Sequence, residues 1–194
     1  MKQLRSAALL VLLLALPWAL RAQAISMNGS SDDVPRLQLG LNYNYFHANA
    51  PPGQCGCFSF NGGSGTIVYN ITPRWAGVAD LMLGHANNVN NTGQNITIFN
   101  YLFGPRYTYR SRSRFVPYGQ VMLGGAKEDV NIVFDINRNA FGVLAGGGVT
   151  TQLKHRFGVT IIEGDWIYTR IPNAVNNRQN DIRIATGITY HFGN

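Results

Sequence analysis

Apolar and polar side chains alternate with a period of two along most of the chain after residue 35. In the segment LQLGLNYNY, leucine or tyrosine occupies every second position from Leu37 to Tyr45, with glutamine, glycine or asparagine between them. This alternation predicts β-strands, because successive side chains of a strand point to opposite faces. The eight segments that show it are 36–47, 63–72, 75–86, 95–110, 114–126, 139–153, 156–170 and 181–192.

The connections between these segments alternate between short and long. Three of them contain only two or three residues, namely Pro73-Arg74, Ser111-Arg112-Ser113 and Lys154-His155. The other four are longer and cover 48–62, 87–94, 127–138 and 171–180. Short turns at one end and longer loops at the other are typical of outer-membrane barrels. With an even number of strands, an exported chain is expected to place its tight turns in the periplasm and its long loops outside the cell.

The residue types on the two strand faces indicate which face meets which solvent. The apolar face is dense in tyrosine, phenylalanine, tryptophan, leucine and isoleucine, and charged residues make up only 13% of the chain. A water-facing surface of this kind would favour aggregation, whereas a barrel in a bilayer requires an apolar outer band. We therefore expect the apolar face to point to lipid and the polar face to point inward. A soluble barrel of the lipocalin type, with its faces reversed, is the competing fold.

Charged residues on the inward face are expected to meet in the barrel interior. Burying an ion costs on the order of several kcal/mol unless it is paired, so the acidic and basic residues should form salt bridges. Such a network is either a static core or a set of pairs that rearrange to open a narrow ion path. The predicted interior network consists of Asp80, Arg106, Glu163, Asp165 and Arg183. The predicted aromatic girdle at the membrane interfaces consists of Tyr43, Tyr45, Trp75, Tyr107, Tyr109, Trp166, Tyr168, Tyr190 and Phe192.

The first 24 residues have the features of a secretory signal peptide. Lys2 and Arg5 precede an apolar run, and Ala22-Gln23-Ala24 is a small-x-small cleavage pattern. We expect cleavage after Ala24, a flexible N-terminus over 25–35 and a barrel domain over 36–194. Export places the two cysteines, Cys55 and Cys57, in an oxidising compartment, where they form a candidate loop disulfide.

Composition and motifs give little support to other functions. The net charge of +7 is scattered along the chain, which argues against a nucleic-acid partner. Cysteine and histidine do not occur at metal-ligand spacing, so neither a metal nor a cofactor is expected. The residues considered for catalysis are His47, His85, Ser59 and Ser64, but no local motif links them. We therefore interpret the protein as a non-enzyme.

Several segments carry a family resemblance. They are Phe103-Gly104-Pro105-Arg106-Tyr107, the stretch from Tyr118 to Gly125, the run Asp165–Arg170 with Asn180–Arg183, and the terminal aromatic pair Tyr190 and Phe192. With these features, the chain resembles the eight-stranded outer-membrane β-barrel superfamily typified by the transmembrane domain of outer-membrane protein A. The resemblance implies an all-β, single, antiparallel up-and-down transmembrane barrel. The peptidoglycan-binding domain attached to many members is not expected here.

The resemblance also implies a location and partners. It places the protein in a Gram-negative outer membrane as a monomer surrounded by lipid and inserted by the barrel-assembly machinery. The expected function is a non-catalytic structural or surface role, including that of a narrow porin-like channel. One alternative is an adhesin or recognition protein that acts through the extracellular loops. A second alternative is an outer-membrane lipid-modifying enzyme.

Overall fold

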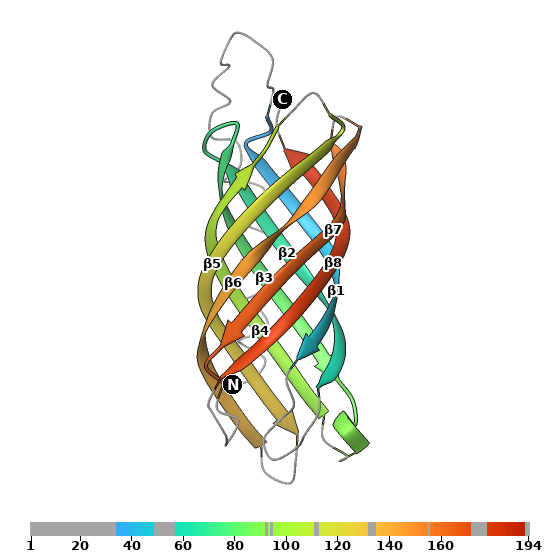
Figure 1. Ribbon diagram of the computed structural model, residues 1–194, viewed down its shortest axis with the longest axis vertical. Coiled ribbons are helices and arrows are strands. Elements are labelled where there is room, and N and C mark those ends of the chain that lie inside the picture. The colour runs from blue at the N-terminus through green and yellow to red at the C-terminus, as the bar shows by residue number, and fades with distance from the viewer. Residues whose placement is uncertain are drawn as a thin grey trace, which may run out of the picture. The chain divides into compact units, whose positions relative to one another are not determined.

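The computed structural model is a single closed barrel of eight antiparallel strands (Figure 1). Each strand pairs with its neighbours in chain order, and the first strand pairs with the last. The structure describes residues 34–48, 57–91, 93, 95–110, 113–131, 135–154, 156–171 and 178–192. The strands are β1 (Leu37–Ala48), β2 (Phe58–Asn70), β3 (Trp75–Ala86), β4 (Asn95–Thr108), β5 (Phe115–Asn131), β6 (Asp135–Lys154), β7 (Phe157–Thr169) and β8 (Gln179–Phe192). The predicted fold class is confirmed. The predicted signal peptide 1–24, its cleavage, nearly all of the segment 25–35 and Cys55 lie outside the described residues.

The barrel has two distinct ends. The turn end carries the tight connections 71–74, 109–114 and 155–156, whereas the loop end carries the other connections and the short 3-10 helix η1 (Val89–Asn91). Antiparallel pairing of β1 with β8 closes the wall, with Leu37 opposite Phe192 near the turn end. In the described part of the chain, no helix is long and apolar enough to cross a membrane.

Three strands, β2, β5 and β6, extend at the loop end by four or five residues beyond the predicted bounds. β2 begins at Phe58 rather than at residue 63, because 58–62 pair with the end of β1, where Ala48 stands opposite Phe58. β5 and β6 likewise extend through most of the predicted loop 127–138, and Asn131 pairs with Asp135. Residues 127–131 and 135–138 are mostly polar and do not alternate clearly, whereas 58–62 (FSFNG) alternates over only a few residues. Their backbone hydrogen bonds come from the paired strand and do not require apolar side chains.

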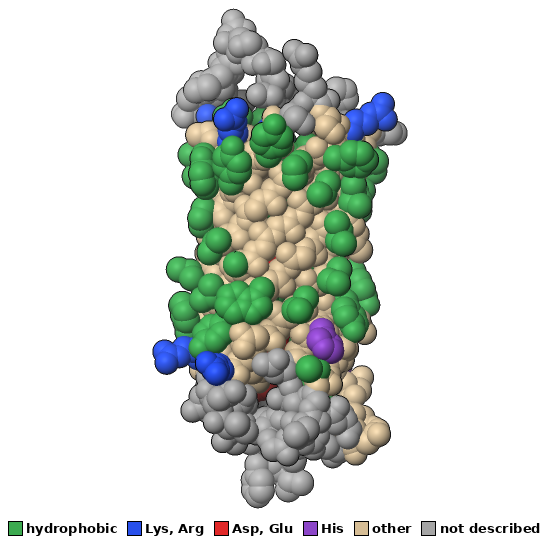
Figure 2. All heavy atoms as spheres, viewed as in Figure 1, with side chains coloured by type: hydrophobic (Ala, Val, Ile, Leu, Met, Phe, Trp, Pro, Cys, Tyr) green, Lys and Arg blue, Asp and Glu red, His purple; other side chains and the backbone are tan. Residues whose placement is uncertain are grey.

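Large hydrophobic side chains are exposed along the outer wall. Hydrophobic side chains gather toward both ends of the wall, and lysine and arginine lie beyond them (Figure 2). The predicted girdle residues lie on this wall. Among them, Trp75 packs edge-on against Tyr107 with 5.0 Å between ring centres, and Tyr190 packs in the same way against Phe192 at 4.7 Å. Tyr168, Tyr190 and Phe192 are partly buried, and the other girdle residues are exposed.

Candidate functional site: the interior charge network

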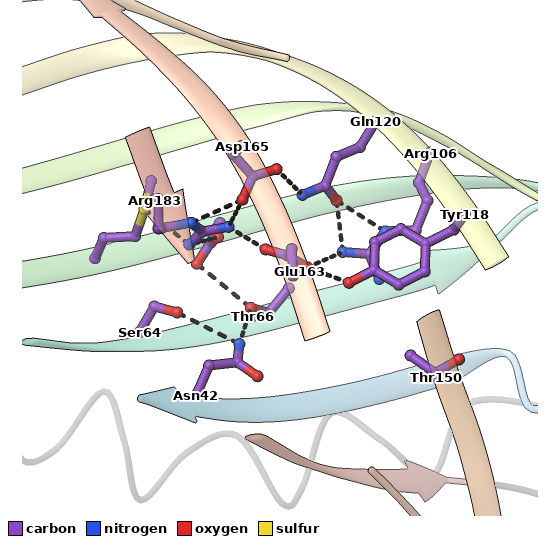
Figure 3. A network of polar contacts seen from close by, with 12 residues as sticks. Asn42, Ser64, Thr66, Arg106, Tyr118, Gln120, Thr150, Glu163, Asp165 and Arg183 are labelled. Carbon is purple, nitrogen blue, oxygen red and sulfur yellow. Dashed lines mark hydrogen bonds and ion pairs between the residues drawn. The ribbon is translucent and has the colours of Figure 1, made fainter. Parts of the chain in front are cut away.

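Arg183 is the centre of a buried group of charges inside the barrel (Figure 3). Its side chain has 0% exposure. Nε and Nη2 donate to Asp165 Oδ2 at 2.8 and 2.6 Å, and Nη1 donates to Asp80 Oδ2 at 2.9 Å. Nη2 also donates to Glu163. One guanidinium from β8 therefore holds carboxylates from β3 and β7, on both sides of the interior.

A second guanidinium extends the network toward β4 and β5. Arg106 donates from Nε and Nη2 to Gln120 Oε1 at 2.9 and 2.6 Å, and Nη2 lies 3.8 Å from Glu163 Oε2. Its guanidinium carbon lies 4.0 Å from the centre of the Tyr118 ring, in a cation–π contact. The Tyr118 hydroxyl donates to Glu163, and Gln120 Nε2 donates to Asp165 Oδ1 at 3.2 Å.

Neutral side chains and glycines complete the arrangement. Thr66 donates to Asp80 Oδ1 at 3.3 Å, and Asn42 donates to Thr66 at 3.0 Å. On β6 the inward positions next to the charges are glycines: a Cβ at Gly146 would collide with the carboxylate of Asp165, and one at Gly148 would lie 2.8 Å from the Tyr118 hydroxyl oxygen. The network therefore needs glycine at these positions, because the narrow interior of an eight-stranded barrel is filled by side chains.

The structure brings all five predicted network residues together. Tyr118, Gln120 and Thr66 also belong to this network but are not among the residues predicted for it from the sequence. These residues carry no charge, so composition does not mark them. A register argument would have found Gln120, which stands opposite Arg106, just as Asp165 stands opposite Arg183.

An apolar cluster fills the interior between the network and the loop end. The Phe46 ring stacks on the Phe60 ring with 4.6 Å between centres. Along β1, β2, β4, β5 and β7, the larger members of the cluster lie closer to the loop end than the network residues of the same strand. The fully or nearly fully buried members there include Phe46, Phe58, Phe60, Met82, Ile96, Ile98, Leu102, Met122, Leu144 and Ile167. The expectation of a polar inward face is therefore wrong for much of this half of the barrel, although polar residues are also buried there, namely Asn100, Glu128, Thr169, Gln179 and Asp181.

At the loop end the outer wall carries polar side chains instead of apolar ones. Next to inward Phe46 and Phe60, the outward positions are polar: His47 and Ser59 are exposed, and His47 Nδ1 lies 3.0 Å from Ser59 Oγ. His85 similarly contacts Thr97 at 2.8 Å. An apolar interior with a polar exterior is the pattern of a barrel in water. The apolar and polar faces thus exchange where the wall leaves the lipid-facing band.

The residues considered for catalysis are only partly brought together. His47 contacts Ser59, which also accepts a hydrogen bond from Tyr45, but within the described residues no carboxylate orients this histidine. Ser64 points inward and donates to Asn44 at 3.5 Å. No group of three metal-ligating side chains occurs in the described ranges. Cys57 is exposed just before β2, and its predicted pairing with Cys55 stays a prediction.

Solved structures share this fold. The crystal structure of Neisserial surface protein A aligns with a TM-score of 0.65 and 14% identity, covering 85% of this chain and 100% of that chain. Ail, the attachment invasion locus protein of Yersinia pestis, aligns with a TM-score of 0.54 and 13% identity, covering 80% of this chain and 98% of that chain. No curated protein matches the sequence.

A family model covers nearly the whole chain. The model described as the outer membrane protein beta-barrel domain matches residues 6–192. This match confirms the resemblance to outer-membrane barrels found in the sequence and gives the outer membrane as the location of the protein. The chain belongs to the outer membrane protein beta-barrel domain family.

Proposed function

We propose that the protein is a non-catalytic outer-membrane barrel that does not conduct solutes and that acts at the cell surface through its loop end. The observation that carries this proposal is that two groups of side chains fill the interior, one after the other along the barrel axis. The charge network around Arg183 crosses the barrel, and the apolar cluster occupies the space between this network and the loop end. A solute that followed the barrel axis would have to displace both.

The two fillings oppose ion passage for different reasons. Separating Arg183 from its carboxylates exposes unpaired buried charges, which costs on the order of several kcal/mol. The side chains of the apolar cluster offer no hydrogen-bond partner to a hydrated ion, and the buried polar residues of the same half, such as Asn100 and Thr169, are separated by apolar groups. Apolar constrictions close channels by excluding water. Because the two fillings follow each other along the axis, a rearrangement of the charges alone would leave the apolar cluster in place.

The surface role is supported by the loop end itself. With an even number of strands, the usual orientation places short turns in the periplasm and loops outside. The exchange of polar and apolar faces near Phe46 and His47 indicates that the barrel wall continues beyond the membrane, and connecting segments on a rigid scaffold are common binding sites. Two barrels of the same fold are named as a surface protein and an attachment protein, in agreement with this role.

Conductance measurements test the closed interior. We expect the folded protein, reconstituted in planar bilayers in concentrated potassium chloride, to give no discrete current steps above the bare membrane. A shift in gel mobility on boiling would show that the reconstituted sample contains folded barrels, and a known porin added to the same bilayer would show that steps are detectable. Reproducible steps that scale with the amount of folded protein would contradict the proposal and favour a narrow channel.

Labelling of intact cells tests the orientation. In a variant with Cys55 and Cys57 replaced by serine, we expect Asn87→Cys at the loop end to react with a membrane-impermeant maleimide. The matched Thr72→Cys at the turn end should react only after the cells are broken. Both positions are exposed, so differences in burial do not explain the contrast. Labelling of Thr72→Cys alone on intact cells would reverse the orientation and remove the surface role.

A further inference from the structure

A polar cavity occupies the interior on the other side of the network, toward the turn end. Its volume is about 80 Å³, and a smaller cavity of about 20 Å³ near Glu163 shares part of its lining. Arg106 and Tyr118 belong both to the network and to the lining, and the other lining residues of β1, β2, β4, β5, β7 and β8 lie closer to the turn end than the network residues of the same strand. We call the larger cavity the turn-end vestibule. A buried water needs roughly 10–15 Å³, so the vestibule has room for several waters or for a small ion with several oxygens.

The lining of the vestibule favours a negatively charged ligand. Threonine hydroxyls and side-chain amides form much of the wall, and the basic side chains are Arg106, Arg110 and His191. Among the described residues that line it, none is acidic. In the smaller cavity Glu163 does take part, but its carboxylate already accepts from Arg183 and from the Tyr118 hydroxyl. The charge facing the larger cavity is therefore positive.

The basic groups are held in place, and Arg106 retains a donor for a ligand. Arg106 bonds to Gln120 through Nε and Nη2, which leaves Nη1 for a group in the cavity. Arg110 Nε donates to the carbonyl of Pro73 at 2.7 Å, which fixes its side chain beside the neighbouring turn. His191 Nδ1 is buried and makes no hydrogen bond to the described residues. A buried polar atom without a partner is unfavourable, so a ligand or water is expected next to it.

The surroundings of the vestibule would attract anions. Arg36, Arg74, Arg114 and Arg156 are exposed at the turn end. The acidic residues of the described ranges all lie in the network or toward the loop end. A surface with one sign of charge raises the local concentration of oppositely charged solutes. The fixed guanidinium groups then match the geometry of phosphate oxygens, which arginine binds with paired, charge-assisted hydrogen bonds.

We propose that the turn-end vestibule binds a phosphate-type oxyanion through Arg106, Arg110 and His191. The oxyanion is either a free phosphate or phosphate ester, or the phosphate of a lipid headgroup reached from the turn end. The oxyanion would come from the periplasm, and this part of the proposal alone rests on the orientation proposed above. The site itself does not depend on a surface role or on a closed interior.

The test measures binding of inorganic phosphate to the detergent-folded protein by titration calorimetry at low ionic strength. We expect saturable binding to the wild type and about tenfold weaker binding to Arg110→Gln, the loss that corresponds to one charge-assisted hydrogen bond. The matched control is Arg114→Gln, which removes an exposed charge of the same turn that does not line the vestibule. It should change the affinity by less than about twofold, because exposed charges are screened. A gel shift on boiling shows that each variant is folded.

A competition experiment distinguishes the two sources of phosphate, and two outcomes would overturn the proposal. Competition by a short-chain phosphatidylglycerol would identify a lipid headgroup as a ligand, whereas phosphate binding without such competition would identify a free phosphate compound. Absence of saturable phosphate binding to the wild type would overturn the proposal. Equal losses in Arg110→Gln and Arg114→Gln would also overturn it, because they would reflect general charge attraction. The assay uses neither membranes nor cells, so its outcome is independent of the conductance and labelling results.

Discussion

Replacement of Arg183 by methionine is expected to destabilise the barrel by about 3–5 kcal/mol, the usual effect of removing one partner from a buried ion pair. Methionine is unbranched and fits the space of the arginine stem, so the main change is electrostatic. Asp80, Glu163 and Asp165 would lose their shared cation, and the nearest remaining one, Arg106, has its Nη2 3.8 Å from Glu163. Folded proteins have small net stabilities, so part of the variant is expected to fail to fold.

The measurement is urea unfolding of the protein in lipid vesicles, followed by the gel shift and by tryptophan fluorescence. The matched control is Lys127→Met, which removes an exposed charge on the outer wall and should change the stability by less than about 0.5 kcal/mol. A protonated carboxyl group carries no charge, so the gap between Arg183→Met and the wild type should narrow as the pH falls below neutral. Equal unfolding midpoints for Arg183→Met and the wild type would show that the network does not stabilise the fold.

The sequence predicts the strands and the lipid-facing side well, but it does not predict which residues meet across the interior. Alternation alone places Asp80 and Arg183 on the inward face. Their contact joins residues 103 positions apart, and it depends on the tilt of the strands, which decides which inward side chains reach the same level. Pairing along the ladder, as between Asp165 and Arg183, follows from register and is more accessible to sequence reasoning.

The apolar cluster was missed because the alternation changes phase within strands. In β1 the apolar positions are odd-numbered up to Tyr45 and then even-numbered at Phe46 and Ala48. β4 shows the same change in reverse, with Ile96 and Ile98 inward and Phe99 and Tyr101 outward. If one face of each strand is assumed to be apolar along its whole length, this shift of the apolar positions is not detected. The change has a physical cause, since an outer wall in water requires polar residues outside and apolar residues inside.

The assignment of the central outer wall to lipid leads to a second large effect. Val121 lies in β5 midway between Phe115 and Lys127, its side chain points outward, and the residue is 52% exposed. We expect Val121→Arg to destabilise the folded barrel in vesicles by about 2–4 kcal/mol, the cost of an arginine near the middle of a bilayer. The measurement is the urea midpoint in vesicles, compared with that of the wild type.

Asn139→Arg is the matched control, because Asn139 is also exposed and outward but pairs with Lys127 on the loop-end part of the wall. It should lower the stability by less than about 0.5 kcal/mol, as an arginine in water does on an exposed surface. Position along the strand, rather than the substituted side chain, then determines the size of the effect. If both variants were as stable as the wild type, the central wall would not be in contact with lipid. If both were equally destabilised, the lipid-facing band would extend past the exchange of faces, and the loop end would not project from the membrane.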